Sequence, residues 1–229
     1  MTPAEHPMND HAAKLLRCIP QKILAKSLDP AHRCLEKQER PVAVVFVDVE
    51  GCTRLCEDLS PNQMNQVIEA YFSRFFDAVQ SAGGTVNEIM GDGFMAIFDE
   101  GEIQNNTHAA VSAALAIQRQ TRELNAQRLP ELDPLLVNIG IHTGIGFVGF
   151  TKFRTSSGER WTYTASGPVT NIASRLCALA TGGSILVSAD IAGHIDDARY
   201  ALEPLGPRKL KNVSRPVLTY RLSDASTGV

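Results

Sequence analysis

Several features that would assign this chain to a class of protein are absent from its sequence. No apolar run approaches the roughly 20 residues that a membrane-spanning helix needs, and the first 14 residues lack the cationic start and apolar core of a secretory signal. The formal net charge is only −3, so we expect no bulk attraction to nucleic acid or to an anionic membrane. We therefore expect a cytoplasmic protein that binds neither nucleic acid nor a membrane.

Paired cysteines are missing as well. The five cysteines are odd in number and scattered along the chain, which is typical of reduced thiols in the cytosol. Cys52 and Cys56 lie close together, but no second pair of cysteines or histidines stands at a matching spacing, so we do not expect a zinc site. The sequence also contains no internal repeat and no low-complexity tract.

Hydrophobic periodicity predicts an N-terminal arm over residues 1–40, a folded domain over 41–222 and a tail over 223–229. The arm is expected to be helical over 11–28 and to continue as a charged connector over 29–40. In the domain we expect a strand at 42–48, a helix that begins at Ser60 and Pro61 and reaches 79, strands at 85–90 and 94–98, a helix at 107–127, and a strand at 136–143 that continues over 146–150. This order is typical of the split ferredoxin-like arrangement. We therefore predict an α+β fold with a ferredoxin-like βαββαβ core.

Additional C-terminal strands and helices should follow this core. The expected elements are a polar loop or hairpin tip at 151–160, strands at 161–165 and 184–188, a helix at 167–180, a short helix at 189–195, and strands at 200–205 and 217–222.

Two aspartates stand at the ends of strand patterns. Asp48 ends the apolar run VAVVFVD, and Asp92 lies in an Asp-Gly turn between two strands, which is a strong hairpin signal. Taken singly, Asp48 would be a helix N-cap and Asp92 a turn residue. In the ferredoxin-like order, however, the first strand lies beside the hairpin, so both carboxylates would meet at one end of the sheet. Magnesium sites combine one or two carboxylates with substrate phosphates, so the pattern predicts a metal site and phosphoryl chemistry on a nucleotide.

A polar pair follows on the helix predicted over 167–180. Asn171 and Arg175 are four residues apart and share one helical face, whereas Val169, Ile172 and Ala173 belong to the apolar stripe. An amide and a guanidinium on one face suit an oxyanion and a phosphate, although a single pair of this kind is more often a solvated face.

Four motifs together resemble those of the class III nucleotidyl cyclases, in order and at familiar spacing. They are FVDVEGCT, NEIMGDGFMAIF, NIGIHTGIGFVG and YTASGPVTNIASR. The segment LLRCIPQKILAKSL also resembles the helical segment that often precedes such domains, so the resemblance covers about residues 15–222. It implies the class III cyclase fold and conversion of a nucleoside triphosphate to a 3′,5′-cyclic nucleotide and pyrophosphate. It also implies a head-to-tail homodimer with sites at the interface.

The resemblance assigns roles to individual residues. Asp48 and Asp92 match the aspartates that bind two divalent ions, Mg²⁺ or Mn²⁺, and the Val49 carbonyl is an expected extra ligand. Asn171 matches the residue that orients the ribose, and Arg175 the arginine that stabilises the pentavalent phosphate.

Lys211, in LKNV, lies near the triphosphate-binding lysine of the family, and a surface lysine is an equal alternative. By the geometry of the family, one subunit supplies the aspartates and the other supplies Asn171, Arg175 and Lys211.

Two departures concern the base of the substrate. Adenylate cyclases usually carry Lys and Asp where this chain has Glu88 and Thr164. An ionised Glu88 only accepts hydrogen bonds, whereas Thr164 both donates and accepts. Glu88 therefore suits the N1–H and amino group of guanine, the N3–H of uracil or the amino group of cytosine. Hydrogen-bond type thus disfavours ATP but does not separate GTP from UTP or CTP.

A narrower resemblance favours a pyrimidine. A lone cyclase domain with these motifs resembles the bacterial pyrimidine cyclases of antiphage signalling, whose product, cyclic UMP or cyclic CMP, activates a separate effector. We therefore expect UTP, then CTP, as the substrate, with guanylate or adenylate cyclase as the alternative. An inactive nucleotide-binding module is disfavoured because Asp48, Asp92, Asn171 and Arg175 are all present. A dinucleotide-forming cyclase is disfavoured because its GGDEF-type signature is absent.

Overall fold

The structure is a computed structural model that describes residues 19–28, 36–52, 59–127, 133–195 and 198–225. The chain divides into two compact units, residues 1–35 and 36–229. In the first unit the structure describes helix α2 (Gln21–Leu28), which accounts for the second part of the expected helical arm. Residues 11–18 of that arm lie outside the described residues.

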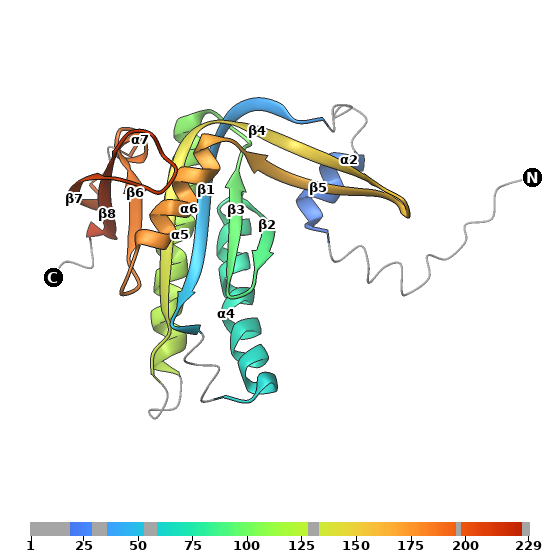
Figure 1. Cartoon of the computed structure of the whole chain (residues 1–229). Helices are drawn as coiled ribbons and strands as arrows, with labels where there is room; N and C mark the ends of the chain where they lie inside the picture. The colour runs from blue at the N-terminus through green and yellow to red at the C-terminus, as the bar shows by residue number, and fades with distance from the viewer. Residues whose placement is uncertain (1–18, 29–35, 53–58, 128–132, 196–197, 226–229) are drawn as a thin grey trace, which may run out of the picture. The chain divides into compact units, whose positions relative to one another are not determined.

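The second unit contains an eight-stranded sheet with helices on both faces (Figure 1). Its elements in chain order are β1 (Gln38–Glu50), α4 (Pro61–Ser81), β2 (Thr85–Met90), β3 (Gly93–Phe98), α5 (Ile103–Ala126), β4 (Leu136–Thr155), β5 (Gly158–Ser166), α6 (Pro168–Leu179), β6 (Ile185–Ser188), α7 (Ala189–Ala192), β7 (Tyr200–Arg208) and β8 (Val217–Asp224). The strand order is β2-β3-β1-β4-β6-β8-β7, and β5 pairs with β4. Strands β2, β3, β1 and β4 pair antiparallel with one another in this order, whereas β4 and β6 are parallel. The predicted ferredoxin-like βαββαβ core with added C-terminal elements is confirmed.

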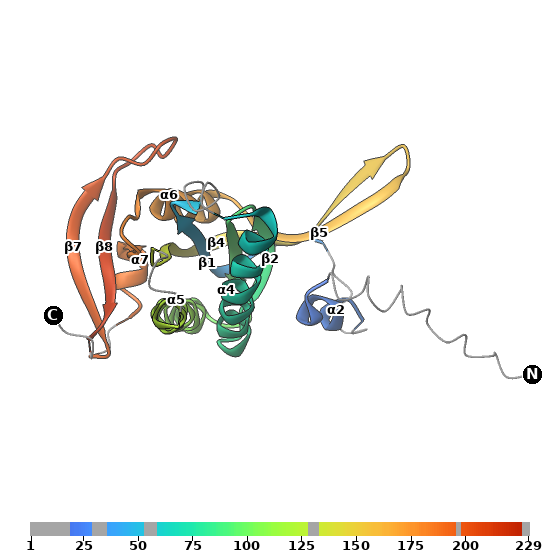
Figure 2. The same ribbon diagram turned by 90° about the horizontal axis from the view of Figure 1, so that it is seen from below.

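Strand β1 is buried on both faces, and its alternate side chains enter two different cores. Ala43, Val45 and Val47 pack in the core beneath α4 and α5. Val42 and Val44 pack on the other side, with Val169 and Ala173 of α6. Figure 2 shows the same division, with α4 and α5 on one side of the sheet and α6 on the other. Since side chains alternate along a strand, Asp48 lies on the α6 side.

Helix α4 begins where its sequence predicts. The Oγ of Ser60 accepts a hydrogen bond from the Gln63 N–H at 3.4 Å, and the Gln63 Oε1 accepts one from the Ser60 N–H at 3.0 Å. This capping box satisfies backbone donors that the first turn leaves unpaired. The apolar stripe Tyr71, Phe72 and Phe75 is buried against the sheet.

Three expected boundaries are corrected by the structure. Strand β1 begins at Gln38 rather than at 42, because residues 38–40 of the expected connector pair with β4. Helix α5 begins at Ile103 rather than at 107. The polar segment 151–160 is a long two-stranded hairpin, with Thr155 paired to Gly158. Backbone pairing and cross-strand contacts hold its strands together, among them the 2.6 Å ion pair of Lys152 with Glu159 and the stacking of Lys152 on the Trp161 ring at 5.1 Å.

None of the described helices is long and apolar enough to cross a membrane.

Candidate active site

The two predicted metal-binding aspartates are brought to the same end of the sheet. Asp48 of β1 stands opposite Gly93 of β3 in the strand register, and Asp92 is the residue directly before Gly93. The Asp92 backbone oxygen accepts a hydrogen bond from the Val49 N–H at 3.1 Å. The β2–β3 turn is therefore tied to the end of β1, next to both carboxylates.

Close backbone packing at this point requires glycine. A Cβ placed on Gly93 would lie 2.5 Å from the backbone oxygen of Val47 and 3.4 Å from Oδ1 of Asp48. Any larger residue would push β3 away from β1, so Gly93 allows the Asp92 turn to approach Asp48.

The electrostatics at the end of the sheet that carries Asp48 and Asp92 favour a cation. The pKa of the Asp48 carboxyl is raised, first by burial and then by the negative charges of Asp92 and Glu50. Among the described residues, no Lys, Arg or His forms an ion pair with Asp48 or Asp92. Two crowded carboxylates beside a backbone carbonyl form an oxygen-only donor set, which fits Mg²⁺ or Mn²⁺.

Within the described ranges, no cluster of three or more His, Cys, Asp and Glu residues encloses a metal position. An ion held here would complete its coordination with water and with substrate phosphates, which is the usual behaviour of Mg²⁺.

Helix α6 crosses the sheet in direct contact with β4. A Cβ on Gly140 would overlap the Cys177 nitrogen and the Ala173 oxygen, and would lie 2.7 Å from the Cys177 Cα. The buried residues Ala173 and Cys177 therefore face the sheet. Asn171 is exposed and Arg175 half-buried; being four residues apart, they share a face of the helix, as predicted.

Cys177 shows how near α6 lies to the aspartates. Burial and, to a smaller extent, the negative charge of Asp48 raise the pKa of its thiol to about 12, against a backbone hydrogen bond at Gly140 that lowers it. The thiol is neutral at physiological pH and points to the Asn138 backbone oxygen at 3.5 Å. It is a packing residue on the side of the sheet that carries Asp48.

A polar network that the sequence did not predict fixes the loop after α6. Oε2 of Glu50 accepts hydrogen bonds from the Gly182 N–H at 2.6 Å and from Asn138 Nδ2 at 2.9 Å. Oδ1 of Asn138 accepts one from the Gly183 N–H at 3.0 Å. These bonds tie the end of β1 to the end of α6. The Gly-Gly pair signals a turn, but no sequence signal shows which carboxylate would bind it.

The two predicted base-recognition residues lie on strands β2 and β5, which are not paired with each other in the sheet. Glu88 is exposed on β2, opposite Met95 in the register. Thr164 is half-buried on β5, and its Oγ1 accepts a hydrogen bond from Nδ2 of Asn87 at 3.2 Å. Asn87 was not among the predicted site residues; an asparagine within a strand is its one unusual sequence feature.

Lys211 is exposed in the loop between β7 and β8. Its neighbour Leu210 is buried in a small cluster with Leu176 and Ala180 at the end of α6. The loop therefore packs against α6, and Lys211 lies close to the residue that follows Arg175.

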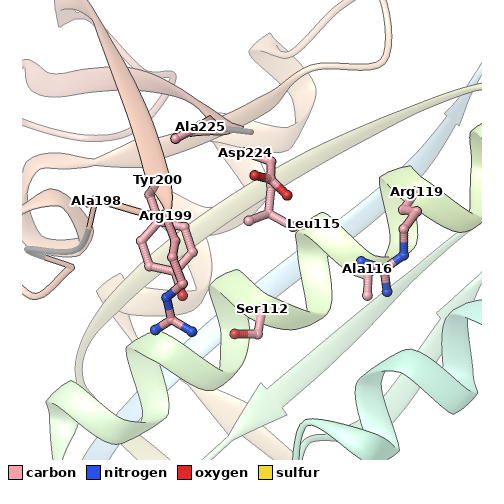
Figure 3. Close-up of a pocket in the computed structure, with 9 residues that line it drawn as sticks. All are labelled: Ser112, Leu115, Ala116, Arg119, Ala198, Arg199, Tyr200, Asp224 and Ala225. Carbon is pink, nitrogen blue, oxygen red and sulfur yellow. The ribbon is translucent and has the colours of Figure 1, made fainter. Parts of the chain in front are cut away.

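A hollow of about 770 Å³ lies elsewhere on the second unit (Figure 3). It is lined by residues of α5, of β7 and of the C-terminal end of β8, among them Ser112, Arg119 and Tyr200, and by none of the predicted site residues. The aspartates and the α6 pair instead lie along the side of the sheet opposite α4 and α5.

The family is identified by comparison with known proteins. A family model described as the adenylate and guanylate cyclase catalytic domain matches residues 35–224. The chain belongs to this family, whose cyclases are phosphorus–oxygen lyases and generally use divalent metal ions.

Individual relatives agree with this. Adenylate cyclase 1 of Rhizobium meliloti is 30% identical over 212 residues, which cover 89% of this chain and 31% of that protein. The crystal structure of the adenylyl cyclase CyaB from P. aeruginosa superposes with a TM-score of 0.73 at 29% identity, covering 82% of this chain and 96% of that one. The guanylyl cyclase Cya2 gives a TM-score of 0.71 at 29% identity, covering 82% and 94%. The chain spans about a third of the length of the Rhizobium relative.

Proposed function

We propose that this chain converts a nucleoside triphosphate to a 3′,5′-cyclic nucleotide and pyrophosphate. The 3′-oxygen of the ribose forms a bond to the α-phosphorus, the bond from that phosphorus to the bridging oxygen of the β-phosphate breaks, and the hydroxyl proton is released. The observation that carries the proposal is the convergence of Asp48 and Asp92 at one end of the sheet, in a domain of the cyclase family.

Asp48 and Asp92, with the Val49 carbonyl, would hold two divalent ions, Mg²⁺ or Mn²⁺. Bound there, the ions would lower the pKa of the attacking hydroxyl and neutralise the triphosphate. Metal binding there would also offset the burial and the repulsion by Asp92 and Glu50 that raise the pKa of Asp48.

The remaining groups stabilise the reacting phosphate. Arg175 donates hydrogen bonds to the charge that develops on the α-phosphate, where a preorganised guanidinium is most effective. Asn171, one helical turn away, orients the ribose, and Lys211 binds the terminal phosphates as a point charge.

We propose that two copies of the chain share each site. Related cyclase domains act as dimers. In the proposed homodimer one protomer supplies the aspartates, and its partner supplies α6 and the base-recognition strands. The exposed apolar side chains Ile145, Phe147 and Trp161 support such a partner, since exposed apolar surface commonly marks an interface.

For the base we propose a pyrimidine, UTP before CTP. Glu88 accepts a hydrogen bond from the N3–H of uracil, whereas in cytosine an unprotonated N3 would face the carboxylate. The resemblance to antiphage pyrimidine cyclases supports a second-messenger role for the product.

GTP is the second candidate. Guanine offers both N1–H and an amino group to Glu88, and on hydrogen bonding alone it matches this carboxylate better than uracil. The similarity to the guanylyl cyclase Cya2 is matched by that to the adenylyl cyclase CyaB, so the preference for GTP over ATP rests on Glu88.

Product identification tests the proposal. The protein is incubated with Mn²⁺ and an equimolar mixture of ATP, GTP, CTP and UTP, and the cyclic products are measured by mass spectrometry. We expect 3′,5′-cyclic UMP as the main product. A cyclic purine nucleotide as the main product would refute the pyrimidine preference but would still support the proposed cyclase activity.

Asp92→Ala serves as the matched variant in the same assay. We expect its activity to fall by well over tenfold, or more than about 1.4 kcal/mol in the barrier, with an unchanged circular dichroism spectrum. Absence of any cyclic product from the unaltered protein would refute the cyclase proposal, and full activity of Asp92→Ala would refute the metal role.

A further inference from the structure

Asn87 occupies a β-bulge of β2, the strand that carries the predicted base-recognition residue Glu88, where β2 pairs with β3. On β2, Val86 pairs with Ala96 and Glu88 pairs with Met95, so Asn87 is an extra residue without a partner in the register. Ala96 belongs to the core beneath α4 and α5, whereas Met95 belongs to the cluster beneath α6.

The bulge decides which way Glu88 faces. Residues two apart on a regular strand share a face, so without the bulge Val86 and Glu88 would lie on the same side of the sheet. Directly paired residues share a face. The extra residue therefore leaves Val86 in the α4–α5 core and turns Glu88 to the side that carries α6 and Asp48.

The side chain of Asn87 reaches the second predicted base-recognition residue. Its Nδ2 donates to Thr164 Oγ1 at 3.2 Å, and the Thr164 hydroxyl donates to the Ala165 oxygen at 3.2 Å. The Oδ1 of Asn87 is buried and has no hydrogen-bond partner in the described part of the chain. A buried amide oxygen without a donor is uncommon in native structures, and it marks a place where a bound group can donate.

The position of β5, the strand that carries Thr164, is also fixed by contacts that do not involve Asn87. The neighbouring Tyr163 donates its O–H to Asp99 Oδ2 at 2.7 Å, and Arg40 lies 3.5 Å from the same carboxylate oxygen. The backbone of β5 is thus held by Tyr163, and the Asn87 amide acts on the Thr164 side chain.

We propose that Asn87 is a positioning residue that determines base specificity, an inference that rests on the proposed cyclase function. Its bulge directs Glu88, its Nδ2 fixes the Thr164 hydroxyl, and its Oδ1 is an acceptor without a partner in the described part of the chain, one residue before Glu88. Two acceptors favour bases with a ring N–H, uracil and guanine, over cytosine and adenine, whose corresponding ring nitrogen is an unprotonated acceptor.

Competition between bases of equal size tests this inference. The ratio of kcat/KM for UTP over CTP, and for GTP over ATP, isolates hydrogen bonding from pocket volume. We expect Asn87→Ala to lower both ratios by about tenfold. The substitution is compatible with the backbone, because Asn212 is the one non-glycine residue with a positive φ in the described segments.

Further variants separate positioning from stability. Asn87→Asp keeps an acceptor in place of Oδ1 but replaces the Nδ2 donor to Thr164 Oγ1 with a second acceptor, so it should restore only part of the ratio. Thr164→Val should lower the kcat/KM ratios. The effect of combining it with Asn87→Ala should be smaller than the sum of the two single effects, because the two side chains act together. Asn65→Ala removes an exposed amide that donates to Glu69 at 2.8 Å on α4 and is the matched control.

The outcomes are distinct. Unchanged ratios in folded Asn87→Ala, an equal fall in the Asn65→Ala control, or an equal loss on all four nucleotides would each overturn the inference. If the unaltered protein prefers purines, the ratio of kcat/KM for GTP over ATP still tests the role of Asn87. If the unaltered protein forms no cyclic product, the proposed function fails, and equilibrium binding of the same four triphosphates tests Asn87 in its place.

Discussion

At the scale of single residues, the candidate site combines charges that the fold itself does not neutralise. Asp48 is destabilised as an anion by burial, by Asp92 and by Glu50, whereas Glu50 is satisfied by Asn138 and by the Gly182 N–H. The two carboxylates therefore differ at one strand end: Glu50 holds the loop after α6, whereas Asp48 forms no ion pair among the described residues. Strained or unpaired groups of this kind are typical of functional sites rather than of structural ones.

The environment of His142 on β4 predicts how the stability of the fold depends on pH. Its Nδ1 lies 2.7 Å from Ser188 Oγ, with Asp190 Oδ2 at 3.7 Å. Burial lowers the pKa of the imidazole, against the charge of Asp190, which raises it. In the unfolded chain this group binds a proton as the pH falls through about 6.5, whereas the folded protein binds it only at lower pH. His142 therefore contributes stability above pH about 6.5, and this is lost on acidification.

Between pH 7.5 and pH 5.5, we expect the thermal midpoint of the unaltered protein to fall more steeply than that of His142→Asn. The free energy of unfolding of the unaltered protein should fall faster than that of the variant by up to about 1.4 kcal/mol per pH unit. Differential scanning calorimetry across this range checks it. All other titratable groups are the same in both proteins and cancel in the difference. Parallel pH dependences for the two proteins would contradict the prediction.

At the scale of elements, the packing of α6 on β4 sets the position of Asn171 and Arg175. A methyl group at Gly140 overlaps the α6 backbone at Ala173 and Cys177, and neither neighbour is a flexible side-chain end. We expect Gly140→Ala to cost about 1–3 kcal/mol of stability by overpacking, to lower the thermal midpoint by several degrees, and to reduce cyclase activity more than stability alone explains.

Gly193→Ala is the control for this prediction, because its nearest non-local atom would be 3.5 Å away and its φ is −71°. Thermal melts and activity at a temperature where both variants are folded give the comparison. Full activity in Gly140→Ala would mean that the exact position of α6 does not matter to the chemistry.

Much of this arrangement follows from the sequence at the same scale. The order of strands and helices, the Ser60 cap and the Asp-Gly turn are local signals, and they sufficed to predict that Asp48 and Asp92 meet. The bulge at Asn87 was not predictable, because the slip in register depends on Ala96 and Met95 entering different cores. The polar hairpin after residue 150 also lacks a hydrophobic pattern, since its strands have no buried face.

At the scale of the whole molecule, the proposed site is completed by a second copy, and mixing inactive variants tests this. In the proposed homodimer, Asp92→Ala removes a metal ligand from the site to which its partner contributes Arg175. Arg175→Ala damages the site that uses the partner's aspartates. In a mixed dimer one site carries both substitutions and the other carries none.

We therefore expect the two inactive variants to regain activity when they are mixed and allowed to exchange subunits. With equal amounts and random exchange, half of the dimers are mixed and each has one intact site, so about a quarter of the unaltered activity should return. Exchange is measured separately, by native mass spectrometry of differently tagged chains. If each chain instead completed its own site, the mixture would stay inactive despite exchange, because every site would retain one lesion.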